Sequence, residues 1–168
     1  MSRRGAERKD GDAVVQRIRE ALGQEWIPAL YEREILTRRT RRYVLNAPGP
    51  GSRVEITHTL LGIELKIGRR RILVPDLATA RYLAVFARIG IGAVAIPYDI
   101  TVISSLADRL ESSFQRTMLL ADHFSAGGSR HRAARLKSRL LSDIRAALAR
   151  LGAGARYPTF DLIATRRP

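Results

Sequence analysis

The chain contains no cysteine, which excludes disulfide bonds, thiolate metal sites and a cysteine nucleophile. It also lacks a long apolar run. The longest, residues 89–97, is far shorter than the roughly 20 residues that a membrane-spanning helix needs. The opening residues, MSRRGAERKDGD, contain no apolar segment of the kind found in a signal peptide. These absences predict a soluble protein of a reducing compartment, cytoplasmic or associated with the nucleoid, with no membrane partner.

Acidic residues are also in short supply. The 168 residues include 30 Lys and Arg but only 16 Asp and Glu, which gives a formal net charge of +14. Such an excess is typical of proteins that bind nucleic acid. All but three of the basic residues are arginine, whose guanidinium group can donate two hydrogen bonds to phosphate oxygens at once. Aromatic residues make up only 6% of the chain, so stacking on single-stranded bases is not strongly indicated.

The positive charge is distributed unevenly along the chain. Residues 1–45 carry eleven basic and seven acidic residues, and residues 46–124 carry nine and seven. Residues 125–168 carry ten and two, so the largest excess lies in the last quarter. We therefore predict a disordered basic N-terminus (1–11), an α/β core domain (12–124), and a basic C-terminal helix and tail (125–168).

Hydrophobic periodicity predicts a mixture of helices and strands. Apolar residues recur at helical spacing after Asp12, which is the expected N-cap, and they alternate with polar residues over 54–67, as in half-buried strands. The pattern predicts an α/β or α+β fold with a small mixed sheet of three to four strands, flanking helices and a C-terminal helical hairpin. The later expected elements are a strand at 71–74, a helix capped by Asp76 and ending at 89, a strand at 93–97, and helices from 101 and at 130–151.

Three clusters of basic residues are candidates for contact with a nucleic-acid backbone. The first follows the N-terminal helices, the second lies at the tip of a predicted hairpin, and the third surrounds the last helix. A hairpin tip can enter a groove or rest on phosphates. Together with the net charge, the clusters predict a protein that binds nucleic acid, DNA slightly in preference to RNA. The clusters are Arg38, Arg39, Arg41 and Arg42; Arg69, Arg70 and Arg71; and Arg130, Arg132, Arg135, Lys137 and Arg139.

A second hypothesis starts from Glu55 and from the triplet that Glu64 and Lys66 enclose. If the two strands pair across the intervening turn, the three side chains lie on one face. Two carboxylates can hold a hard divalent cation, and a neighbouring lysine can orient the attacking water and stabilise charge on a phosphate. The same residues also suit a solvated strand face, where cross-strand pairs contribute roughly 0.2–1 kcal/mol. Both interpretations remain open.

Residues 53–97 resemble the restriction-endonuclease-like superfamily, the PD-(D/E)xK nucleases, and among them the archaeal Holliday-junction resolvases. The likeness consists of an acidic residue on one strand (Glu55), an ExK triplet on the next (Glu64 and Lys66), the helical segment ATARYLAVFARIG and the apolar strand GAVAIPY. It implies Glu55 and Glu64 as metal ligands, Lys66 as the catalytic lysine, and magnesium as the cofactor.

A third hypothesis concerns the last two predicted helices. The final helix carries an apolar stripe that includes Leu136, Leu140 and Ile144. The two helices could pair with a partner, or with a second copy of the chain in a homodimer, which would make this a non-enzymatic assembly protein. Whether the chain is an enzyme is therefore left open by its sequence.

Overall fold

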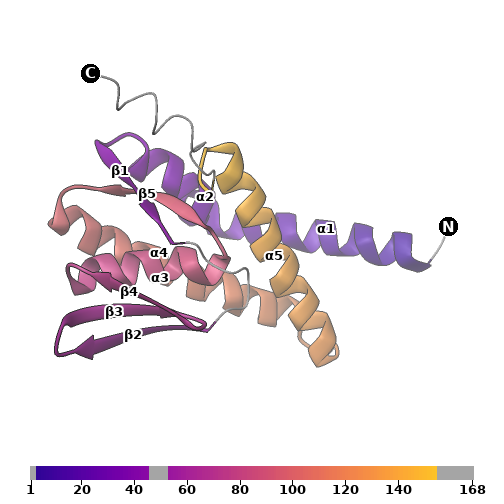
Figure 1. Ribbon diagram of the computed structural model, residues 1–168. Helices are drawn as coiled ribbons and strands as arrows, with labels where there is room; N and C mark the ends of the chain where they lie inside the picture. The colour runs from indigo at the N-terminus through magenta and orange to yellow at the C-terminus, as the bar shows by residue number, and fades with distance from the viewer. Residues whose placement is uncertain (1–2, 46–52, 155–168) are drawn as a thin grey trace, which may run out of the picture.

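The computed structural model describes residues 3–45 and 53–154. Figure 1 shows α1 extending away from the rest of the molecule and α5 crossing it, with α3 and α4 next to the strands. The elements are α1 (Arg3–Leu22), the 3-10 turn η1 (Gly23–Glu25), α2 (Ile27–Leu30), the π-helical turn η2 (Tyr31–Ile35), β1 (Thr40–Val44), β2 (Val54–Thr59), β3 (Gly62–Ile67), β4 (Arg70–Val74), α3 (Leu77–Ile89), β5 (Ala93–Pro97), α4 (Ile100–Phe124) and α5 (Arg130–Arg150).

The strands form two separate antiparallel sheets. Strands β2, β3 and β4 pair in sequence order, and β1 pairs with β5. Gly68 makes the tight β3–β4 turn with a φ of 60°, a left-handed conformation that glycine adopts at little steric cost. The mixed α and β fold predicted from the sequence, with a helical hairpin at its C-terminal end, is confirmed. Its strands, however, form two antiparallel sheets where one mixed sheet was expected.

The outer edge of β5 is closed by two tyrosine hydroxyls. Leu45 N–H donates to the carbonyl of Gly92 at 2.8 Å, next to the first residue pair of the β1–β5 ladder. Because hydrogen-bonded and non-hydrogen-bonded pairs alternate along an antiparallel ladder, the backbone groups of Ala95 point away from β1. The hydroxyl of Tyr31 accepts from Ala95 N–H at 3.0 Å, and that of Tyr82 donates to the Ala95 carbonyl at 2.7 Å. Burial raises the pKa of the Tyr82 phenol well above its usual value, so it remains a donor.

The rest of this edge is closed as well. Gly154 N–H donates to the Ala93 carbonyl at 2.7 Å, and Pro97, two residues beyond Ala95, has no N–H to offer. Tyr82 of α3, Tyr31 of η2 and Gly154, which follows α5, therefore occupy backbone groups of Ala93 and Ala95 on the outer edge of β5. These contacts stand in the way of a further strand on this edge, which is consistent with the separation of the two sheets.

Helix α3 is buried on almost its whole circumference. It packs against β2, β3 and β4 and also against α4, and nine of its thirteen residues are buried. As the sequence predicts, Asp76 caps it by accepting from Thr79 N–H at 2.7 Å, and Gly90, with a φ of 91°, ends it. Its Arg81 forms two hydrogen bonds to the Glu111 carboxylate of α4, at 2.7 and 3.1 Å. The three strands and α4 therefore surround α3 on almost every side.

Helix α1 begins earlier than predicted. The prediction of disorder is wrong for residues 3–11, which form the first turns of α1, and residues 1–2 lie outside the described residues. Asp12, the expected N-cap, lies inside the helix. Its carboxylate pairs with Arg139 of α5, and Asp10 pairs with Arg132 at 3.2 Å. Contacts with a distant helix therefore stabilise a segment whose local sequence is polar.

Helix α5 is part of the core, whereas the sequence suggested a separate basic segment. Leu136, Leu140, Ile144 and Leu148 are buried in the same hydrophobic cluster as α3. No domain boundary therefore lies at residue 125 within the described part of the chain. The apolar stripe of α5 is covered by the chain's own core, so the assembly hypothesis receives no support from it.

Replacement of Tyr82 by Phe tests the closure of β5. We expect Tyr82→Phe to lower the free energy of unfolding by about 1–3 kcal/mol, because it leaves the partly buried Ala95 carbonyl without its donor. The measurement is urea unfolding at neutral pH. Tyr98→Phe is the matched control, since Tyr98 is 58% exposed and loses the same atom. Equal losses of stability in the two variants would contradict the structural role of the Tyr82 hydroxyl.

Candidate nucleic-acid interface

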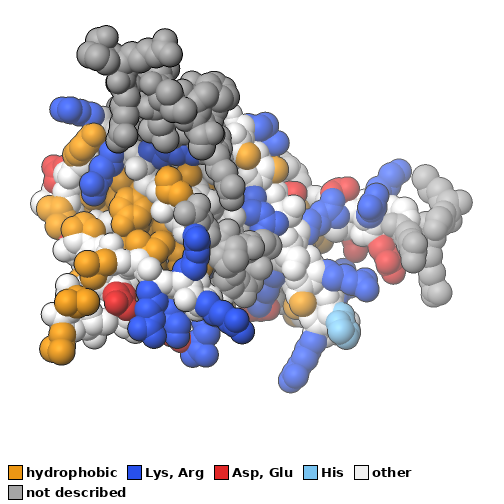
Figure 2. All heavy atoms as spheres, in the orientation of Figure 1, with side chains coloured by type: hydrophobic (Ala, Val, Ile, Leu, Met, Phe, Trp, Pro, Cys, Tyr) orange, Lys and Arg blue, Asp and Glu red, His pale blue; other side chains and the backbone are white. Residues whose placement is uncertain are grey.

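The most open group of basic residues lies at the β3–β4 turn. Arg69, Arg70 and Arg71, called the hairpin cluster below, are all exposed. The strand register places Lys66 directly opposite Arg71, so their side chains share the outer face of the sheet. Figure 2 shows basic side chains gathered beside this part of the sheet. Arg69 and Arg71 make no ion pair with any residue that the structure describes.

Sequence reasoning missed Arg53, which lies next to the hairpin cluster. Gly68 N–H donates to the Arg53 carbonyl at 2.8 Å, so the residue before β2 is adjacent to the β3–β4 turn. The pairing of Val54 with Ile67 produces this arrangement. The pairing of β2 with β3, if it is extended by one residue beyond Val54, would have identified Arg53 from the sequence.

Glu55, Glu64 and Lys66 share one face of the β2–β3–β4 sheet, as the strand pattern predicts. Glu55 lies directly opposite Lys66, and Glu64 lies two residues along β3 on the same side. This face is turned away from α3, because the alternate residues Leu65 and Ile67 are buried. The three residues therefore lie together on the outer surface of the sheet, where water reaches them.

The resemblance implies a magnesium site at Glu55 and Glu64. The Glu55 carboxylate is paired with the Arg53 guanidinium at 2.6 Å, and Lys66 lies opposite it. Within residues 3–45 and 53–154, no group of three or more Asp, Glu, His or Cys side chains is placed to hold a metal ion. Magnesium ions prefer carboxylate oxygens that no cation occupies. Metal-dependent cleavage by Glu55, Glu64 and Lys66 stays a prediction.

The first basic cluster of the sequence is divided by the fold. Arg38 donates to the Glu34 backbone carbonyl at 2.9 Å and approaches its carboxylate at 3.9 Å. Arg39 stacks over the ring of Tyr98 at 5.1 Å. Arg42 is half-buried on β1, whereas Arg41 is exposed. Arg39 and Arg41 therefore remain accessible to a ligand, while Arg38 is occupied in the fold.

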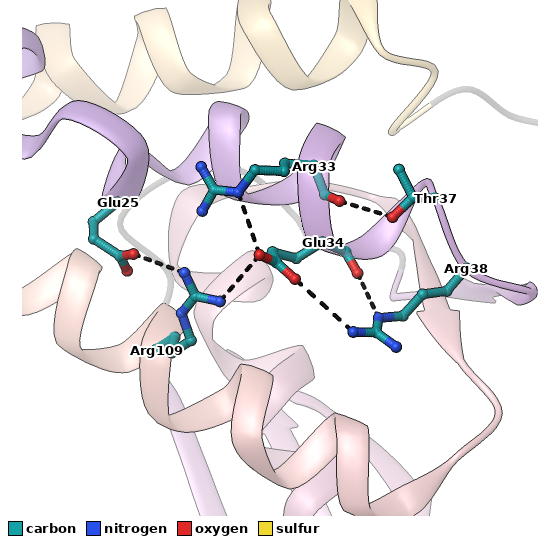
Figure 3. A network of polar contacts seen from close by, with 6 residues as sticks. All are labelled: Glu25, Arg33, Glu34, Thr37, Arg38 and Arg109. Atoms are coloured by element: carbon teal, nitrogen blue, oxygen red, sulfur yellow. Dashed lines mark hydrogen bonds and ion pairs between the residues drawn. The ribbon is translucent and has the colours of Figure 1, made fainter.

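A polar network explains the position of Arg38 (Figure 3). Arg109 of α4 pairs with Glu25 at 2.7 Å and with Glu34 at 3.4 Å. Arg33 also bonds to the Glu34 carboxylate, at 3.2 Å. Hydrogen bonds from Arg33 and then Arg109 hold the pKa of Glu34 below its usual value. The network connects α4 to the turns η1 and η2, so its charges stabilise the fold.

The third cluster, on α5, is also partly occupied. Arg132 and Arg139 pair with the α1 carboxylates, and Lys137 pairs with Asp122 of α4 at 2.8 Å. Arg130 and Arg135 are exposed and pair with no residue in the described ranges. Only part of the charge excess on α5 is therefore available to an external anion.

Comparisons of the chain with protein-family models, curated proteins and solved structures found no match. In the part of the chain that the structure describes, no helix combines the length and apolarity needed to cross a membrane.

The Arg109 network should make stability depend on pH in acid. A carboxylate whose pKa is lowered in the folded state stabilises the protein above its ordinary value of 4.5, and this contribution is lost as the pH falls through the lowered pKa. We expect the free energy of unfolding to fall as acid is added, and to fall less in Arg109→Met. The difference should be small, because the groups are partly exposed. Urea unfolding between neutral and acid pH measures it.

Arg116→Met is the matched control for this experiment. Arg116 lies on the same helix and is exposed, so its loss should leave the pH dependence of the wild-type protein unchanged. If Arg109→Met kept the full acid loss of stability, the network would not be its source.

Proposed function

We propose that this protein binds nucleic acid through phosphate contacts, with DNA slightly favoured over RNA. The observation that carries the proposal is the hairpin cluster, where three consecutive arginines are exposed at one tight turn. Guanidinium groups bind phosphate oxygens with charge-assisted hydrogen bonds. The net charge of +14 adds a long-range attraction for a polyanion.

The shape of the hairpin supports the preference for DNA. Strands β3 and β4 form a hairpin at one side of the three-stranded sheet, and the major groove of B-DNA is wide enough to admit a hairpin of two strands. The major groove of an RNA duplex is deep and narrow, so a hairpin tip can reach only its flanking phosphates. Arg41 and Arg130, which are exposed elsewhere on the surface, are further phosphate contacts in this proposal.

Removal of two charges from the hairpin cluster tests the proposal. In Arg69→Ala/Arg71→Ala we expect the slope of log affinity for duplex DNA against log salt to decrease by about two, because each lost phosphate contact releases about one counterion fewer. Affinity at moderate salt should fall roughly tenfold. Fluorescence anisotropy with a labelled duplex, repeated over a salt series, gives both quantities.

Arg116→Ala/Arg150→Ala is the matched control. It also removes two exposed arginines, but from α4 and the end of α5, away from the hairpin cluster. Its salt slope should remain close to that of the wild-type protein. An interaction that does not depend on salt, or equal losses in the two double variants, would count against the hairpin cluster.

Cleavage is the second candidate function, and it is favoured by the shared face of Glu55, Glu64 and Lys66. We expect plasmid, branched DNA and RNA to be bound but recovered intact after incubation with magnesium or manganese, because Glu55 is paired with Arg53. Gel electrophoresis of the recovered nucleic acid is the measurement. Metal-dependent cleavage that Lys66→Ala abolishes would replace binding with catalysis as the function. Cleavage that persists in Lys66→Ala would point to a contaminating nuclease.

A further inference from the structure

A groove lies between the first half of α1 and the start of α5. Its volume is about 1240 Å³, compared with roughly 300–1000 Å³ for the pockets that bind small molecules. Residues of α1, the last residue of α4 and the first turns of α5 line it. Figure 1 shows α1 extending past this end of α5. The groove is therefore larger than the usual small-molecule pocket.

The rim of the groove is basic. Arg8, Arg132, Arg135 and Arg139 line it, against two carboxylates. One of these, Asp10, pairs with Arg132 at 3.2 Å, while Arg135 pairs with no described residue. Figure 2 shows basic side chains on both helices at this end of the molecule. The excess of cations favours an anionic ligand.

The lining also includes three apolar side chains, one of which is an aromatic ring. Val14, Phe124 and Leu136 line the groove. The Phe124 ring is held by the guanidinium of Arg17, 4.7 Å from its centre, and by an edge contact with His123 at 5.4 Å. A fixed aromatic ring within a basic groove is the combination with which proteins bind single strands, since bases stack on the ring and phosphates contact the cations.

We propose that the groove binds an unpaired segment of nucleic acid, with a base stacked on Phe124 and its phosphates held by Arg8 and Arg135, which pair with no acidic residue in the described ranges. This inference rests on the proposed function and specifies the form of its ligand. The bases of a duplex are stacked on one another, so they cannot reach the ring without being unpaired. An acidic peptide would satisfy the arginines but offers no base to Phe124.

Two strands of equal charge test the inference. Oligothymidylate and an abasic strand of the same length carry the same phosphates, but only the first has bases. We expect the wild-type protein to bind oligothymidylate roughly tenfold more tightly, as measured by fluorescence anisotropy. Phe124→Leu keeps an apolar side chain and should remove this preference, leaving affinity for the abasic strand and for duplex DNA unchanged.

A second variant keeps the test decisive if Phe124→Leu does not fold, as judged by circular dichroism. Arg135→Glu reverses a charge in the groove, and Arg150→Glu makes the same change outside it on the same helix. Arg135→Glu should weaken binding of oligothymidylate several-fold more than Arg150→Glu does. Equal effects of the two would overturn the inference.

The outcomes separate this inference from the proposed function. If duplex DNA binds through Arg69 and Arg71 but bases add nothing to single-strand affinity, only the groove proposal fails. The groove proposal also fails if polyglutamate displaces labelled oligothymidylate as effectively as unlabelled oligothymidylate of equal charge does. If no strand, single or double, binds at low salt, the proposed function fails and the groove proposal fails with it.

Discussion

Helix α3 carries apolar side chains on almost every side, and the rest of the described structure packs around it so that they are buried. Sheet β2–β3–β4 covers one side, α4 packs against another, and α5 contributes leucines to the same core. Helix α3 also contacts the second sheet, because the hydroxyl of its Tyr82 donates to the Ala95 carbonyl on the outer edge of β5. Charged groups are thereby confined to the outer surfaces. Arg81, a charged residue near the start of α3, forms hydrogen bonds with the carboxylates of Asp108 and Glu111 on α4.

The positive charge of the surface falls into two classes with different consequences. Some guanidinium groups are paired within the fold, such as Arg109 between α4 and the preceding turns, or Arg139 between α5 and α1. Others, such as Arg69 and Arg135, pair with no described residue. Only the second class can exchange water and counterions for phosphate without breaking an internal contact. The net charge therefore overstates the number of guanidinium groups that are available to an external anion.

The features that the sequence could predict depend on neighbouring residues. The Asp76 cap needs only a residue three positions away, and the common face of Glu55 and Lys66 follows from alternation and one turn. The features that it could not predict join distant segments. The pairing of β1 with β5, and the bond from Ala95 to Tyr31, connect residues about fifty or more positions apart. No local pattern specifies such pairings, because they are chosen by packing of the whole chain.

The same distinction explains the errors at the two ends. The first residues of α1 have a polar sequence that favours disorder, yet α5, more than a hundred residues later, supplies the arginines that pair with them. The charge of α5 suggested a basic appendage, because its buried leucines could not be seen to share a core with α3. The groove between α1 and α5 was invisible for the same reason.

Chemical footprinting of arginine tests the central claim most directly. Phenylglyoxal modifies accessible guanidinium groups, and mass spectrometry locates the modified residues. With duplex DNA bound at low salt, Arg69, Arg70 and Arg71 should be protected from modification, while the exposed Arg116 and Arg150 should react as they do in the free protein. Unchanged reactivity of the hairpin cluster in the presence of bound DNA would contradict phosphate binding by this turn.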